Sequence, residues 1–331
     1  MGAFKEGIAE AVKRESRDPR YQSSLAASYP ALGGRVFFVL KTAATNYTQF
    51  AEDHPDYKSG DGVATIPAVY NTVDAAIGAC TAAQGDVIYV MPGHTETVTA
   101  TSIALDISGV TIIGLGVGKN RPVLTYGAAA ATITVSAANC AVYNIHHIAN
   151  FDNVAAAYTL AAAKDFRLDG NEFVDNSDAL HFVSIVVTGA TDNDADGLSV
   201  VGNYWYALAL APDAFISILA AELRLYVADN HVDMAATNDA GHFITLAAKI
   251  ISGARILRNV CNVVSATGAT VGLFLTGSGT TSTGIVAYNF VTSLDVTSPL
   301  FATAATNLQF FENRLSTASA TSGKLWPAAM A

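Results

Sequence analysis

Three carboxylates in one short loop are the first residues of this sequence whose spacing could do chemistry. Asp192, Asp194 and Asp196 are followed by Gly197, a D-x-D-x-D-G spacing that lets oxygen ligands converge on a hard cation such as Ca²⁺. The twelfth position of such a loop would normally supply a bidentate glutamate, and here it is Asn203. A calcium site and a solvated turn are therefore the two interpretations of this loop.

A second group of residues has side chains suited to a carbohydrate ligand. Asp175 and Asp178 could supply carboxylates, and Trp205 and Tyr206 could stack on a sugar ring. Each pair also has a plainer interpretation, since exposed carboxylates often only solvate a surface and aromatic clusters are common where proteins touch one another. These four residues are the first places to look for a glycan site.

Histidine and cysteine give no sign of a metal centre or another cofactor. His146 and His147 are adjacent, so on a strand they would point to opposite faces and could not both ligate one ion. Cys80, Cys140 and Cys261 are far apart and odd in number, which favours neither a disulfide framework nor a metal knuckle. We therefore expect a protein without a cofactor.

The composition favours strands over helices and excludes several classes of protein. Charged residues make up 14% of the chain and hydrophobic residues 51%, and mean hydropathy is +0.33, which together exclude disorder. No window approaches 18 uninterrupted apolar residues, so we expect no membrane span. The net charge of −10 is unfavourable for binding nucleic acid.

The elements that position these residues fall into three segments. Residues 1–72 are predicted to form a short N-terminal helix and an extended docking arm, because Phe4, Ile8 and Val12 recur every four residues before an irregular stretch. Residues 73–317 contain a repeat, and residues 318–331 form a C-terminal tail. We expect the three apolar residues of the helix to dock the protein onto a partner.

The repeat aligns on one asparagine in every copy. The six clearest copies are FRLDGNEFVD, LSVVGNYWYA, LYVADNHVDM, ARILRNVCNV, GIVAYNFVTS and LQFFENRLST, and CAVYNIHHIA is a less regular seventh. The aligned residues are Asn144, Asn171, Asn203, Asn230, Asn259, Asn289 and Asn313. We predict that these side chains form a stacked amide ladder at one corner of successive coils, since asparagine tolerates left-handed backbone and bonds locally.

Stacked coils of this kind form an all-β parallel solenoid of roughly eight turns, because one unit cannot bury its apolar face alone. The opening phrases GDVIYVMPGHTETV and GVTIIGLG resemble the first turns of the right-handed, pectate-lyase-like parallel β-helix superfamily, and more narrowly the β-helix structural proteins of tailed bacteriophages. The resemblance covers roughly residues 73 to 317. It implies a right-handed solenoid.

Enzymes of the superfamily that this chain resembles cleave acidic polysaccharides with clustered aspartates or a calcium ion. No adjacent pair of aspartates occurs here, so we expect no catalysis. The resemblance favours a phage virion structural protein, made in the host cytoplasm. We expect it to be a decoration or cement protein on the capsid surface, bound to the major capsid protein and homo-oligomeric, with a homotrimer as one arrangement. The alternative is a tailspike or receptor-binding β-helix that binds or depolymerises a host surface glycan.

Overall fold

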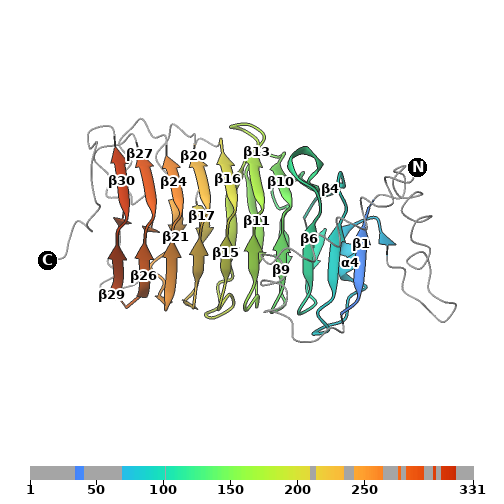
Figure 1. Ribbon diagram of the computed structural model, residues 1–331, viewed down its shortest axis with the longest axis horizontal. Helices are drawn as coiled ribbons and strands as arrows, with labels where there is room; N and C mark the ends of the chain where they lie inside the picture. Colours follow the sequence, from blue (N-terminus) through green and yellow to red (C-terminus); the bar gives the residue numbers. More distant parts are fainter. Residues whose placement is uncertain are drawn as a thin grey trace, which may run out of the picture.

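The computed structural model describes residues 34–40, 69–100, 102–208, 214–234, 242–263, 275–276, 281–293, 301–302 and 307–317. These residues form a right-handed parallel β-solenoid with almost no helix, as the repeat predicts (Figure 1). Between residues 87 and 302, each coil contributes one strand to each of three sheets, which we name A, B and C in the order in which the chain visits them.

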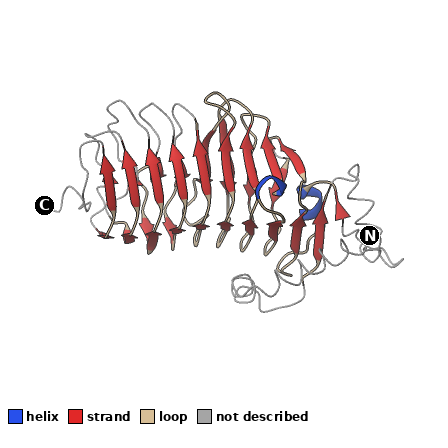
Figure 2. Cartoon of the chain, turned by 45° about the horizontal axis from the view of Figure 1, so that its top comes forward, coloured by secondary structure: helices blue, strands red, loops and turns tan. Residues whose placement is uncertain are grey.

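The three sheets run the length of the solenoid, and every described strand pairing is parallel (Figure 2). Sheet A contains β2 (Val69–Tyr70), β1 (Val36–Val39), β3 (Val87–Val90), β6 (Thr111–Gly114), β9 (Ala141–Tyr143), β12 (Arg167–Asp169), β15 (Ser199–Val201), β19 (Tyr226–Ala228), β23 (Ala254–Leu257), β26 (Thr283–Ala287) and β29 (Asn307–Phe311). Sheet B contains β4 (Thr95–Val98), β7 (Val123–Tyr126), β10 (His146–Ala149), β13 (Glu172–Asp175), β16 (Tyr204–Ala207), β20 (His231–Met234), β24 (Val260–Val263), β27 (Phe290–Ser293) and β30 (Arg314–Thr317). Sheet C contains β5 (Ile103–Leu105), β8 (Ile133–Val135), β11 (Val154–Leu160), β14 (Phe182–Thr188), β17 (Ala214–Ser217), β21 (His242–Thr245), β25 (Leu275–Thr276) and β28 (Phe301–Ala302).

Three short elements complete the described fold. Strands β18 (Glu222–Leu223) and β22 (Ile251–Ser252) pair at the turn between sheets C and A, and η2 (Gly118–Asn120) is a single 3₁₀ turn. Helix α4 (Val73–Ile77) lies at the N-terminal end of the solenoid, where Thr72 caps it and Val73 and Ile77 are buried. The helix thus covers the end of the apolar interior.

The first strand of sheet A lies earlier in the sequence than the repeat predicts. Strand β1 pairs with β3 over four residues, from Val36 opposite Val87 to Val39 opposite Val90. The boundary placed after residue 72 is therefore corrected, because part of the predicted arm is a strand of the solenoid. The run of four apolar, β-branched and aromatic residues over Val36–Val39 was the available signal, and the lack of an aligned asparagine concealed it.

The asparagine ladder lies in the turn between sheets A and B. From Asn171 onward, each Nδ2 donates to the Oδ1 of the next aligned asparagine at 2.9–3.2 Å, and each backbone N–H donates to the same oxygen. Each Nδ2 also donates to a main-chain carbonyl of the preceding coil, as Asn230 does to Val200 at 2.9 Å. The chain of amides ends at Asn313, and all six side chains are buried.

Asn144 lies outside this chain, which corrects its assignment to the ladder. Its Nδ2 donates to the carbonyls of Gly114 and Gly116, and the N–H of Ile145 is the group that donates to Asn171 Oδ1 at 2.9 Å. Asn144 therefore occupies the position before the ladder, where φ is positive in every coil from this one onward. The expectation that the ladder asparagines themselves are left-handed is also wrong. Instead, the residue before each ladder asparagine has the left-handed conformation, as at Gly170 and Tyr288.

Large aromatic side chains fill the interior of the N-terminal half. Tyr126, Tyr158, Phe173 and Phe182 are fully buried and pack edge to face against one another. Further along, Trp205 stacks with Phe215, and Phe215 stacks with Phe243, the ring centroids lying 6.2 and 5.3 Å apart. The core is thus continuous from coil to coil.

One histidine lies inside this aromatic core with both ring nitrogens satisfied. Tyr126 Oη donates to the Ala157 carbonyl and accepts from His147 Nδ1 at 3.2 Å, and Tyr158 Oη donates to His147 Nε2 at 3.2 Å, which assigns the neutral Nδ1–H tautomer. Burial holds the pKa of His147 well below its usual value. His146 points outward, so the two adjacent histidines occupy opposite faces of β10, as predicted.

Candidate functional site

The outer face of sheet B gathers the polar and aromatic side chains of the candidate site, and we name this surface the B face. Its members lie one and three positions after the ladder corner, where the alternation of a strand turns side chains outward. Over six strands they are His146 and Ile148, Glu172 and Val174, Tyr204 and Tyr206, His231 and Asp233, Val260 and Asn262, and Phe290 and Thr292.

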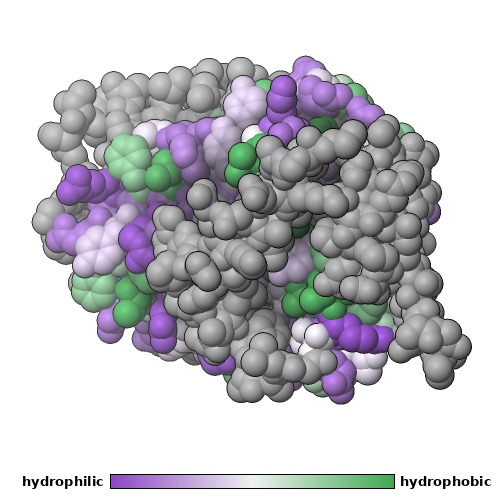
Figure 3. All heavy atoms as spheres, turned by 45° about the vertical axis from the view of Figure 1, so that its right-hand side comes forward, coloured by the Kyte–Doolittle hydropathy of each residue, from purple (hydrophilic) through white to green (hydrophobic). Residues whose placement is uncertain are grey.

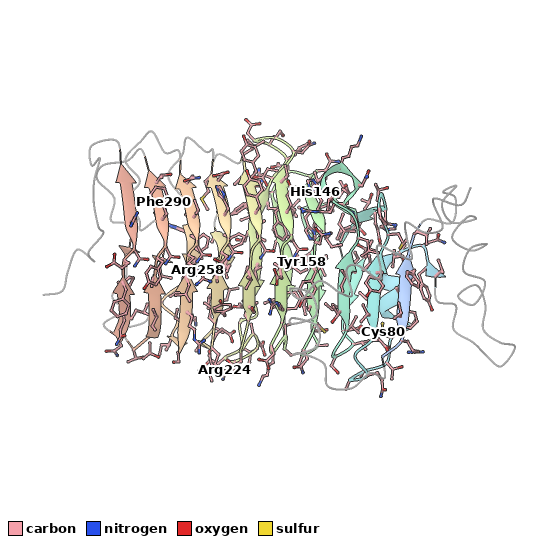
Figure 4. The ribbon with its side chains drawn as sticks, in the orientation of Figure 1. Cys80, His146, Tyr158, Arg224, Arg258 and Phe290 are labelled. Carbon is pink, nitrogen blue, oxygen red and sulfur yellow. The ribbon has the colours of Figure 1, made fainter. Side chains whose placement is uncertain are left out.

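Parallel stacking places these residues in two columns along the solenoid axis. At about 4.8 Å per strand, the six coils from His146 to Phe290 span about 24 Å. Figure 4 shows His146 and Phe290 along the same row of strands, with Arg224 at the opposite edge of the view. The B face is therefore an elongated strip.

One carboxylate organises the N-terminal part of the B face. Glu172 Oε2 accepts from Arg121 Nη1 at 3.0 Å and from His146 Nδ1 at 3.0 Å. Arg121 follows the 3₁₀ turn η2, which brings its side chain from the edge of β7 across to β13. Its Nε is buried without a hydrogen-bond partner. The positive charge is thus held against the protein's own carboxylate.

A second carboxylate organises the centre of the B face. Asp233 Oδ2 accepts from Tyr204 Oη at 2.9 Å, while its Oδ1 accepts from His231 Nε2 at 2.9 Å and from Asn262 Nδ2 at 2.6 Å. Thr292 Oγ1 extends the network by donating to Asn262 Oδ1 at 2.8 Å. The network crosses four adjacent coils, and Glu172 lies in register with Tyr204, so it adjoins the first cluster.

These contacts set the protonation of the two central groups. Burial raises the pKa of Tyr204, and the hydrogen bond to Asp233 raises it further, to about 12. Burial would also raise the pKa of Asp233, but the hydrogen bonds from Asn262 and Tyr204 and the charge of His231 outweigh it and lower that pKa. Asp233 is therefore an ionised acceptor beside a neutral phenol at neutral pH.

His231 is a partly exposed member of this network, and its hydrogen bond to Asp233 determines its tautomer. When its Nε2–H donates to Asp233, its Nδ1 carries a lone pair, and 47% of the side chain is exposed. A carboxylate that fixes the tautomer of an imidazole in this way prepares the other nitrogen to accept a proton. The arrangement can bind hydroxyl groups and can assist their deprotonation.

Of the four residues that the sequence suggested for a glycan site, two are exposed and two are buried. Tyr206 is 37% exposed on the B face, and Asp178 is exposed in the loop after β13. Trp205 is wrong for this role because it points inward and is fully buried. Asp175 is buried as well, where it accepts from the N–H groups of Phe182 and Leu208.

The D-x-D-x-D-G loop is hydrogen-bonded to the equivalent turn of the next coil. Asp192 Oδ1 accepts from the N–H of Ala221 at 2.9 Å, and Asp196 Oδ1 accepts from the N–H of Leu223 at 2.7 Å. In the described parts of the chain, no group of three His, Cys, Asp or Glu side chains is arranged to hold a metal ion, and Asp194 joins no such group. The geometry favours a structural role over calcium binding.

A buried glutamate lies beside this loop. Glu222 is 1% exposed, its Oε2 accepts from the N–H of Ala195 at 3.0 Å, and its Oε1 has no partner. Burial raises its pKa to about 7, the Ala195 N–H opposes this, and the charges of the three loop aspartates add to it. Glu222 is thus mostly protonated below pH 7 and about half protonated at pH 7.

The predicted docking helix with Phe4, Ile8 and Val12 and the C-terminal tail 318–331 lie outside the described residues. No described helix is long and apolar enough to cross a membrane. On the face shown in Figure 3, the visible described surface mixes hydrophilic and hydrophobic residues.

Comparison with known proteins gives a likeness of fold. No family model matches the sequence, and no curated protein matches it. A solved structure described as a rhamnogalacturonan lyase resembles this one, with 10% identity, a TM-score of 0.37, and coverage of 85% of this chain and 87% of that chain. At these values the likeness transfers no substrate and no residue role.

The comparison corrects one expectation. The sequence predicts a protein without catalysis, whereas the solved structure that the chain resembles is named as an enzyme. The expectation that the protein has no catalytic activity is therefore withdrawn. The expected place in a phage virion, the major capsid protein as partner and the homotrimer remain untested predictions.

Proposed function

We propose that the protein binds a glycan strand along the B face, with the strand running parallel to the solenoid axis. The observation that carries this proposal is the Tyr204–Asp233–His231–Asn262 network, which presents hydrogen-bonding groups on three neighbouring coils. A surface that repeats at each coil suits a ligand that also repeats, because equivalent groups of a polymer then meet equivalent positions of the protein.

Aromatic rings on the same strip support a sugar ligand. Tyr206 and Phe290 are 37% and 39% exposed, and Tyr204 packs edge to face against His231 with the ring centroids 5.3 Å apart. Aromatic faces provide apolar area for the C–H side of a sugar ring, while the phenol and imidazole groups bond its hydroxyls. The combination is typical of a binding surface in which a few polar groups fix the orientation of a ligand.

Binding to oligosaccharides by isothermal titration tests the proposal. We expect Tyr206→Ala and His231→Ala each to weaken binding about tenfold, which corresponds to about 1.4 kcal/mol. The matched control is Phe311→Ala, which removes an aromatic side chain that is 49% exposed on sheet A and should leave binding unchanged. Equal losses in all three variants, or no binding by the wild type, would contradict the proposal. Product analysis of the same mixtures reports whether bound glycan is cut.

A further inference from the structure

The charged groups of the B face are already paired within the protein, and this determines which ligands they can recognise. Arg121 and His146 both donate to Glu172, so the strongest donors at the N-terminal end are directed at a neighbouring side chain. A ligand carboxylate approaching Arg121 would have to compete with Glu172, which is held at 3.0 Å.

The same holds at the centre of the B face. His231 Nε2, Tyr204 Oη and Asn262 Nδ2 all donate to Asp233. What these residues leave available is mainly acceptors: the remaining lone pairs of Asp233, Nδ1 of His231 and the second lone pair of the Tyr204 hydroxyl. Glu172 Oε1 adds another acceptor, since Arg121 and His146 both donate to Oε2.

An acceptor-rich surface binds a ligand that brings donors. Sugar hydroxyls are donors, whereas carboxylate and sulfate groups bring acceptors and negative charge, which Asp233 and Glu172 would repel. The exposed cation Arg314 lies on β30, three strands beyond Asp233 and one strand past the C-terminal end of the B face. The whole chain carries a net charge of −10, which adds to the repulsion of a polyanion.

We propose that the ligand of the B face is an uncharged, hydroxyl-rich glycan and not a polyuronate or sulfated chain. This inference rests on the proposed function and adds the chemical class of the ligand. It follows from the internal pairing of Arg121 with Glu172 and of His231 with Asp233, which leaves the strip without an unoccupied cation at its centre among the described side chains.

A comparison of neutral and acidic hexasaccharides tests this inference. The neutral probes are the hexamers of β-1,4-glucose, β-1,3-glucose, mannose, xylose and N-acetylglucosamine, and the acidic probe is hexagalacturonate. We expect at least one neutral probe to bind at least about tenfold more tightly than hexagalacturonate. Its affinity should change less than about twofold between about 20 mM and 500 mM salt, because no charge is neutralised.

A charge variant provides the second arm of the test. Glu172→Gln keeps an acceptor for Arg121 but removes the negative charge, so hexagalacturonate should bind about tenfold more tightly to this variant. The matched control is Asp165→Asn, which removes the negative charge paired with Arg224 at the turn between sheets C and A and should not change hexagalacturonate binding. Asparagine suits this position because φ of Asp165 is 55°.

The outcomes separate the two proposals. Wild-type protein that binds hexagalacturonate as tightly as the neutral probes, with the binding lost in Tyr206→Ala, would overturn the neutral-ligand inference and support the glycan-binding function. An unchanged affinity of Glu172→Gln for hexagalacturonate would also overturn the inference. Absence of binding by every probe would overturn the proposed function and the inference together.

Discussion

The imidazole of His147 lies flat against the ring of Phe173, with centroids 4.6 Å apart and planes inclined by 10°. The two residues are in register on β10 and β13, and both are fully buried. A charged imidazolium at this place would lose its water and would also lose the acceptor that Tyr158 requires. The pair therefore makes the core sensitive to acid.

The first prediction concerns this sensitivity. Because the pKa of folded His147 lies well below the 6.5 of the unfolded chain, its contribution to stability is complete above about pH 6.5 and is lost as pH falls below it. We expect the melting temperature of His147→Phe to fall less than that of the wild type between pH 6.5 and 5. Tyr158→Phe retains the histidine, so it should remain acid-sensitive. Parallel curves for wild type and His147→Phe would contradict this.

A second prediction concerns Glu222, whose contribution to stability is lost as pH rises rather than as it falls. The pKa of Glu222 is about 7 in the folded protein, against 4.5 for a glutamate in the unfolded chain, so the native state binds its proton more tightly. Its contribution to stability is complete below about pH 4.5 and is lost as pH rises to about 7. Glu222→Gln cannot ionise and should gain melting temperature relative to the wild type as pH rises from 5 to 8. A constant difference between the two proteins would exclude this role for Glu222.

A third prediction concerns the ladder. Asn230→Ala removes the partners of Asn203 and of the Val200 carbonyl and leaves buried groups unsatisfied. We expect a cost of about 3 kcal/mol in unfolding free energy by urea denaturation. Asn144→Ala is the control at the half-buried position before the ladder, and about 1 kcal/mol is expected there. Similar losses of unfolding free energy in both variants would show that the ladder hydrogen bonds stabilise the protein no more than those of Asn144.

A fourth prediction uses the left-handed position before each ladder asparagine. Tyr288 has φ of 60° and is 62% exposed, so its side chain strains the backbone and contributes little burial. Tyr288→Gly should therefore stabilise the protein by about 1 kcal/mol in the same urea assay. Gly202→Ala places a side chain at the equivalent position, where φ is 65°, and should destabilise by about the same amount. Loss of stability in Tyr288→Gly would be evidence against strain there.

The solenoid could be predicted from sequence because its signals are local and repeated. Asparagine at one corner and an apolar residue three positions earlier, such as Leu168 or Val227, define each coil without knowledge of its neighbours. Asn144 was misplaced by one residue because its coil has asparagine at the left-handed position and Ile145 at the corner. Asparagine suits the left-handed position because it tolerates positive φ, and it suits the corner because its amide bonds to the next coil.

The candidate site was harder to predict because it depends on pairs of residues in different coils. Trp205 and Tyr206 are adjacent in sequence, yet one is core and the other surface. The alignment itself contained the signal, since the second residue after each corner is apolar in the clear copies, as in Phe173 and Val232. The partners of Asp233 follow only from the register between strands, which loops of varying length obscure.

The ladder also bears on how such a molecule can change over evolutionary time. Each coil presents the same amide donor on one side and the same acceptor on the other, and its strands pair only with the strands before and after. An in-frame duplication or excision of one whole coil would therefore join surfaces that already fit. The reach of the molecule can be altered in steps of a single coil, while the core and the remaining coils keep their contacts.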